Sequence, residues 1–248
     1  RPPAGGRHER RAVGAGGRLA PLAGAGDVGV RVVVLVGGRV AASARLRRSV
    51  ADAGLVIAAD GGLRHAAPLG LRPDLLVGDL DSVDGETLSR YPGLPVERHP
   101  PAKDDLDLEL ALAAALARGA RHTLVVGGLT GRLDQTLATL LVVQARHAAG
   151  HDHEVDDGRR RVWPLRPGEG RDLPLRRHER FSLLALDPAA TVSVQGARFP
   201  LDRAILERAR GLGVSNVAAG RVRVVAHAGA VVVVAPGGRA ERSPVTER

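Results

Sequence analysis

The residue pattern with the clearest chemical meaning is a pair of carboxylates in Gly78-Asp79-Leu80-Asp81-Ser82. It directly follows the apolar run Leu75-Leu76-Val77. A turn that begins at Gly78 can bring both carboxylates toward one point. Unpaired carboxylates at such a distance repel each other unless a cation or a proton lies between them. Carboxylate and phosphate oxygens are the ligands that magnesium prefers, so this stretch is a candidate metal site.

Three further stretches place acidic residues beside glycine or at a predicted helix start. They are Ala58-Ala59-Asp60-Gly61-Gly62, Lys103-Asp104-Asp105-Leu106-Asp107 and Gly127-Gly128-Leu129-Thr130-Gly131-Arg132-Leu133-Asp134. Glycines let backbone N–H groups approach phosphate oxygens, and a helix N-terminus favours anions. Lys103 could meet a phosphate as a point charge, and Arg132 could neutralise a phosphoryl group. Together the four stretches predict a site for a magnesium-bound polyphosphate.

Each stretch also has a purely structural interpretation. Asp60, Asp79 and Asp81 are common turn residues. Asp104 could cap a helix with Asp107 three residues later, as in a capping box. The third stretch could be a glycine-rich connection with an Arg132–Asp134 surface pair. The functional prediction therefore depends on these stretches meeting in space.

Composition limits the other function classes. The chain has 248 residues, 44% hydrophobic and 2% aromatic, and a formal net charge of +9. Lys103 is the only lysine, and the arginines are scattered rather than interleaved with aromatic residues, which disfavours nucleic-acid binding. The absence of cysteine excludes disulfides and thiolate metal sites. No apolar run approaches the roughly 20 residues of a membrane span, so we expect no membrane partner and a cytoplasmic location.

The elements that must position these residues alternate between strand and helix. Continuous apolar runs predict buried strands at 31–36, 55–59, 74–77 and 123–126, with a short strand at 96–98. Helices are expected at 43–53, 64–69, 83–90, 104–118 and 133–149. This order predicts an α/β domain over residues 30–150, a doubly wound and mainly parallel sheet with helices on both faces. Ligands of such sheets bind beyond the carboxyl ends of the strands, where the acidic stretches lie.

The composition and the hydrophobic pattern of the sequence change after Gly150. Short alternating strands separated by Gly, Pro and Asp predict an all-β domain of sandwich type over residues 151–236, with 161–165 as an edge strand. Residues 1–29 have no hydrophobic period and are expected to be a disordered tail. Residues 237–248 are expected to form a loose tail.

Taken in order, these motifs resemble the thiamine pyrophosphokinase (thiamine diphosphokinase) family. The resemblance covers roughly residues 32–236 and rests on five short motifs, which are Ala58–Gly62, Arg72-Pro73-Asp74 leading to Gly78–Ser82, Lys103-Asp104 with Asp107, Gly131-Arg132-Leu133-Asp134-Gln135, and Gly213-Val214-Ser215-Asn216. It implies an α/β nucleotide-binding domain, a β-sandwich domain that binds thiamine, and a homodimer with active sites between subunits. It also implies transfer of the pyrophosphoryl group of ATP to the thiamine hydroxyl, with release of AMP and with Mg²⁺.

The resemblance assigns expected roles to individual residues. Asp79, Asp81 and Asp107 would hold magnesium and the triphosphate, and Asp60 would lie near the reacting hydroxyl or the metal. Residues expected to contact ATP are Lys103, Asp104, Gly131, Arg132, Asp134 and Gln135. Ser215 and Asn216 of the partner subunit would help seat thiamine.

Two positions depart from the usual family pattern. Leu106 stands where a Thr is usual, so a hydroxyl contact to phosphate or metal is lost, and Gln135 replaces a His common in bacterial members. The alternatives are a related diphosphokinase acting on a pterin alcohol, which the Ser215-Asn216 loop and the β domain disfavour, and a non-catalytic regulatory protein on the same scaffold, which Leu106 alone suggests.

Overall fold

The structure is a computed structural model that describes residues 30–100 and 105–237. The predicted N-terminal tail, and all of the predicted C-terminal tail except Gly237, lie outside the described residues. In the described part of the chain, no helix combines the length and the hydropathy that a membrane crossing needs.

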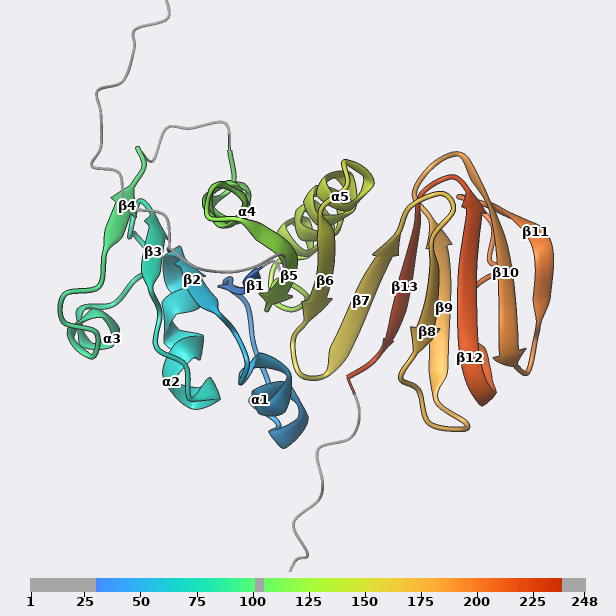
Figure 1. The fold of residues 1–248 in the computed structure, drawn as a ribbon, viewed down its shortest axis with the longest axis horizontal. Coiled ribbons are helices and arrows are strands. Elements are labelled where there is room, and N and C mark those ends of the chain that lie inside the picture. Colours follow the sequence, from blue (N-terminus) through green and yellow to red (C-terminus); the bar gives the residue numbers. More distant parts are fainter. Residues whose placement is uncertain (1–29, 101–104, 238–248) are drawn as a thin grey trace, which may run out of the picture.

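One mixed β-sheet runs through the whole described chain (Figure 1). Its strand order is β11-β10-β12-β9-β13-β7-β6-β5-β1-β2-β3-β4, and β8 pairs with β12. The strands are β1 (Val30–Leu35), β2 (Leu55–Ala59), β3 (Leu75–Gly78), β4 (Val96–Arg98), β5 (Ala120–Val126), β6 (Asp152–Asp156), β7 (Arg160–Leu165), β8 (Gly170–Leu173), β9 (Arg180–Ala185), β10 (Ala189–Ala197), β11 (Leu201–Glu207), β12 (Asn216–Ala228) and β13 (Val231–Pro236).

The strands β6-β5-β1-β2-β3-β4 pair in parallel. Strand β2 is buried along its whole length, because apolar helices cover both faces of the sheet. The helices are α1 (Ala44–Val50), the 3-10 helix η1 (Asp60–His65), α2 (Ala66–Leu69), α3 (Gly85–Ser89), α4 (Asp107–Ala117) and α5 (Leu133–Ala148). Helices α4 and α5 pack on one face, whereas α1, η1 and α2 pack on the other (Figure 1). The predicted α/β class is confirmed.

The remaining strands are antiparallel and share a second core. Strand β13 pairs with both β7 and β9, and β8, β12, β10 and β11 form the next group. Only two residue pairs join β9 to β12. Trp163, Phe181, Val192 and Val224 from both groups lie in one buried cluster, so each group covers the apolar face of the other.

Strand β7 corrects one prediction. It was expected at an edge, but it lies between β6 and β13 and pairs with both. Strand β6 pairs in parallel with β5 and in antiparallel with β7, so it joins the two halves into one sheet. Pro164 opposes Val232 inside this sheet, although proline usually marks sheet edges. Proline is therefore a misleading signal for an edge strand here, because β7 is an interior strand of the sheet.

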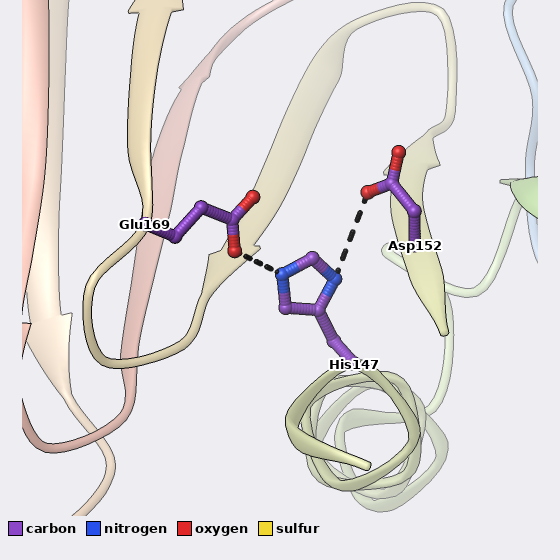
Figure 2. Close-up of side chains that lie close together, drawn as sticks. All are labelled: His147, Asp152 and Glu169. Carbon is purple, nitrogen blue, oxygen red and sulfur yellow. Dashed lines mark hydrogen bonds and ion pairs between the residues drawn. The ribbon is translucent and has the colours of Figure 1, made fainter. Parts of the chain in front are cut away.

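A buried histidine joins the end of α5 to β6 and to the turn between β7 and β8 (Figure 2). The ring of His147 is fully buried between two carboxylates, with Nε2 2.6 Å from Glu169 Oε2 and Nδ1 3.7 Å from Asp152 Oδ1. The backbone N–H of His153 donates to Nδ1 at 3.3 Å, which leaves Nε2 to donate to Glu169. Burial acts to raise the pKa of Glu169, but the His147 hydrogen bond leads the interactions that hold it below its usual value.

This triad has the residue types of a metal site, but its geometry favours a structural tie. The two carboxylates face different ring nitrogens, as Figure 2 shows, although one ligand atom from each of the three side chains lies within 4.8 Å of the others. A guanidinium nitrogen of Arg171 already lies 3.3 Å from Asp152 and 3.9 Å from Glu169. The charge of both carboxylates is therefore balanced by side chains of the protein.

Candidate active site

A cleft of ≈ 630 Å³ opens at the carboxyl ends of the parallel strands. Its lining comes from the segments that follow β1, β2, β3 and β5 and from the start of α4. All of the acidic and glycine-rich stretches found in the sequence contribute to it. This is where parallel α/β sheets bind ligands, because consecutive loops splay apart at that edge.

Three carboxylates converge on one side of this cleft. Oxygen atoms of Asp60, Asp79 and Asp81 all lie within 4.8 Å of one another. Gly78 has φ 142° and Leu80 has φ 71°, and this unusual backbone folds the chain back around Asp79. The backbone N–H of Asp81 donates to Asp79 Oδ1 at 3.1 Å, which fixes the turn.

Asp60 is the buried member of the group. It begins η1 with φ 45°, and its side chain is almost fully enclosed, with 6% of the residue exposed. Oδ2 accepts a hydrogen bond from Ser82 Oγ, whereas Oδ1 is buried without a hydrogen-bond partner among the described residues. A buried unpaired carboxylate oxygen is costly. An oxygen-ligated cation would satisfy Oδ1 and relieve the repulsion within the group, so the three side chains fit Mg²⁺.

Asp107 lies in the same cleft but outside this closest group. A Cβ placed on Gly78 would be 3.3 Å from Asp107 Oδ1 and 3.1 Å from the Cβ of Asp60. Both carboxylates therefore pack against the same glycine. The predicted metal ligands were Asp79, Asp81 and Asp107. The structure adds Asp60, which has a carboxylate oxygen within 4.8 Å of an oxygen of Asp79 and of Asp81.

The start of α4 differs from the capping alternative. The helix begins at Asp107 rather than at 104, and Leu106 occupies the N-cap position. Glu109 takes the third helical position, and its Oε2 accepts from the Leu106 N–H at 3.1 Å. Glu109, and not Asp107, therefore makes the capping hydrogen bond at the third helical position. Lys103 and Asp104, both predicted to contact ATP, lie outside the described residues.

The glycines of the lining form a second wall of the cleft, made of Gly37, Gly38, Gly128 and Gly131. Gly128 N donates to Gly37 O at 2.9 Å, which joins the loops that follow β5 and β1. A Cβ on Gly38 would lie 2.7 Å from Thr130 O, so only glycine allows this approach. The hydroxyl of Thr130 bonds both backbone polar groups of Arg39, at 2.9 and 2.8 Å. This wall presents backbone rather than side chains to the cleft.

Arg132 and Asp134 form the surface pair that the structural interpretation predicted. Two hydrogen bonds join them, one of them from Nε to Oδ1 at 3.1 Å. The pairing raises the pKa of Arg132 and lowers that of Asp134. Both side chains are exposed, so the pair contributes little to stability. Gly131, Arg132 and Gln135 line the cleft, whereas Asp134 does not.

Ser215 and Asn216 do not line this cleft in the same chain. Asn216 is buried at the start of β12, where its amide donates to Phe199 O at 2.7 Å and accepts from Phe199 N at 3.2 Å. Ser215 is exposed and has φ 60°.

Sequence reasoning missed several residues of the lining. Gly37 and Gly38 directly follow the first strand, just as the glycines of the other motifs directly follow later strands. That position after a strand could have identified them as lining residues. Arg64 lies one helical turn after Asp60, but its place in the cleft depends on the 3-10 helix. Thr139 lies on α5 one helical turn after Gln135, and the helical spacing of these two residues was also a usable signal.

Comparisons with known proteins show a family match over part of the chain and a shared fold. Residues 46–151 match the family model for the thiamin pyrophosphokinase catalytic domain. The structure is similar to a thiamine pyrophosphokinase from Bacillus subtilis, with TM-score 0.73 and 20% identity over 84% of this chain and 100% of that one. It is also similar to a thiamin pyrophosphokinase from Candida albicans, with TM-score 0.68 and 14% identity over 84% of this chain and 89% of that one. No curated protein matches the chain. At these identities, the structural similarity shows a shared fold.

Proposed function

Because residues 46–151 belong to the family of thiamin pyrophosphokinase catalytic domains, we propose that the chain transfers pyrophosphate from ATP to the hydroxyl of thiamine. The products are thiamine diphosphate and AMP. One observation supports this most directly: the carboxylates of Asp60, Asp79 and Asp81 meet in a cleft whose other wall is glycine backbone. The carboxylates suit a divalent cation, and the backbone N–H groups of the glycines suit phosphate oxygens.

In this proposal Asp60, Asp79 and Asp81 would hold Mg²⁺, with Asp107 beside them. The ion would supply positive charge to neutralise the phosphate oxygens. The glycine loops after β1 and β5 seat the polyphosphate through backbone N–H groups. Arg132 balances further negative charge at the start of α5.

The reaction is an in-line displacement at the β-phosphorus of ATP. The hydroxyl oxygen of thiamine forms a bond to the β-phosphorus, and the bond from that phosphorus to the oxygen shared with the α-phosphate breaks. AMP leaves with this oxygen, and the hydroxyl proton passes to a carboxylate, either Asp60 or Asp107. Positioning and charge neutralisation supply most of the catalysis.

A homodimer completes the proposed site. Ser215 and Asn216 would seat thiamine from the partner subunit, since they do not line the cleft of their own chain. Helix α5 also exposes an apolar stripe at a spacing of four residues, formed by Leu133, Leu137 and Leu141, which are 72%, 53% and 60% exposed. Such a stripe on a soluble helix is suited to burial against another surface. We place the homodimer contact there, and we predict a cytoplasmic enzyme that binds neither nucleic acid nor membrane.

The assay that tests this proposal measures AMP release by the full chain with ATP and Mg²⁺. We expect AMP and thiamine diphosphate in equal amounts when thiamine is present. AMP release with hydroxymethylpterin instead of thiamine would favour the pterin-alcohol alternative. No AMP release with either acceptor would favour a non-catalytic protein on this scaffold.

A further inference from the structure

Arg64 stands out in the cleft because none of the described carboxylates forms an ion pair with it. Five carboxylates line the cleft, those of Asp60, Asp79, Asp81, Asp105 and Asp107. The two described cations of the lining are Arg64 and Arg132, and Arg132 is already paired with Asp134. Within residues 30–100 and 105–237, no carboxylate pairs with Arg64, whose Nη2 donates only to the carbonyl oxygen of Gly38, at 3.2 Å.

The guanidinium of Arg64 lies between the two walls of the cleft. On one side, Nη2 bonds Gly38, which belongs to the glycine wall. On the other side, Nη1 lies close to Gly61, because a Cβ placed on that glycine would be only 3.4 Å from Nη1. The same Cβ would be 3.1 Å from Ser82 O, so Ser82 also lies next to Gly61. Gly61 follows Asp60, and Ser82 donates to the carboxylate of Asp60. The guanidinium therefore lies beside both segments that a chain of phosphates between the carboxylate group and the glycine loops would contact.

We propose that Arg64 contacts the polyphosphate of the nucleotide and determines its position between the two walls. This inference rests on the function proposed above and adds a residue that the sequence motifs did not assign. A guanidinium has five N–H donors in a planar fork, and one bond to Gly38 leaves donors for phosphate oxygens. Arg64 is exposed at the cleft, so its side chain can turn to a ligand without unfolding its surroundings.

A structural role is the competing explanation, because Arg64 also holds the loop at Gly38. Two substitutions separate these roles. Arg64→Ala removes both the charge and the bond to Gly38, whereas Arg64→Lys keeps the charge and loses the fork. Arg47→Ala is the matched control, because Arg47 is also exposed and also donates to a backbone carbonyl, that of Pro68 at 3.0 Å, away from the cleft.

The measurements are calorimetric titrations of the full chain with ATP, tripolyphosphate and adenosine, each with Mg²⁺, and the KM for ATP. For Arg64→Ala we expect affinity for ATP and tripolyphosphate to fall roughly 10- to 100-fold, since a hydrogen bond to a charged group is lost. The affinity of Arg64→Ala for adenosine should stay unchanged, and its KM for ATP should rise by a larger factor than its kcat falls. The affinity of Arg64→Lys for ATP and tripolyphosphate should lie between that of the wild type and that of Arg64→Ala. Arg47→Ala should behave as the wild type.

Three outcomes would overturn the inference. If Arg64→Ala binds tripolyphosphate as the wild type does, Arg64 does not contact the phosphates. If adenosine and tripolyphosphate weaken equally, Arg64 only shapes the loop. If the wild-type chain turns over neither acceptor and does not bind ATP, the proposed function fails and this inference fails with it, whereas the first two results leave the proposed function standing.

Discussion

The hydroxyl of Ser82 donates a hydrogen bond to the buried carboxylate of Asp60, although 22 positions separate the two residues. This contact joins the segment after β3 to the segment after β2. The same hydroxyl oxygen lies 3.0 Å from Asp81 Oδ1, so one side chain touches two members of the carboxylate group. Ser82 therefore holds the orientation of Asp60, leaving its other oxygen, Oδ1, for a ligand.

Replacing Ser82 by alanine should lower kcat/KM without unfolding the protein. The carboxylate of Asp60 would lose its described hydrogen bond and its fixed orientation, and a bond of this kind to a charged group is worth about 1.5–3 kcal/mol. We expect roughly a 10- to 100-fold loss in AMP release. Ser89→Ala is the control, since Ser89 donates only to the backbone of Glu86 within the described chain. Equal kinetics of Ser82→Ala and Ser89→Ala would show that the contact is not needed.

Replacing Asp81 by asparagine should remove most of the activity. The substitution keeps the size of the side chain and removes one of the three converging charges, so Mg²⁺ binding should weaken. Turnover should fall by orders of magnitude, with an unchanged circular dichroism spectrum. In addition, Mg²⁺ should raise the melting temperature of the wild type and not that of the variant. Asp52→Asn, at an exposed position, is the control. Near-normal AMP release by Asp81→Asn would refute the metal assignment.

Placing a charge on the apolar stripe of α5 tests the dimer. Leu137→Asp should shift the chain from dimer to monomer in light scattering, because a buried unpaired carboxylate is strongly unfavourable at an interface. Activity should fall with the dimer if the partner subunit completes the site. Ile205→Asp is the control, since Ile205 is similarly exposed, at 62%, on the edge strand β11. A Leu137→Asp protein that remains dimeric would place the interface elsewhere.

Local patterns in the sequence predicted the strands well. The runs at 55–59 and 96–98 match β2 and β4 at both ends, because each is bounded by turn-forming residues that end the extended chain. Asp79 and Asp81 were predicted to lie together because a turn that begins at Gly78 can bring both carboxylates toward one point. These features depend on neighbouring residues alone, and sequence patterns report such features directly.

Features that depend on tertiary contacts were not predictable in this way. The resemblance placed Asp60 near the metal or the reacting hydroxyl, but its position in the carboxylate group depends on its place as the first residue of η1 and on Ser82, which reaches it from the segment after β3. The start of α4 moved from 104 to 107 because Glu109 bonds the Leu106 N–H. Strand β7 became an interior strand because β13 returns from the end of the chain to pair with it. In each case, distant or competing partners decided the outcome.

Two buried histidines should make the stability depend on pH. Burial lowers the pKa of both His65 and His153 to about 4, and for His153 the hydrogen bond to His151 O only partly opposes this effect. In the unfolded chain a histidine has a pKa of about 6.5. Between these values the unfolded state binds protons that the folded state does not. Stability is therefore fully present above pH 6.5 and decreases as the pH falls toward 4, by at most about 1.4 kcal/mol per pH unit for each histidine.

Urea titrations between pH 7 and pH 5 would measure this slope. Trp163 is the only tryptophan and is fully buried, so its fluorescence reports unfolding. His153→Gln removes one titrating group and keeps a side chain that can donate to His151 O, so its free energy of unfolding should vary less steeply with pH than that of the wild type. His178→Asn is the control, because His178 is exposed. If His153→Gln and the wild type show the same slope over this range, the proton uptake on unfolding arises from other groups, and burial of His153 does not set the pH dependence.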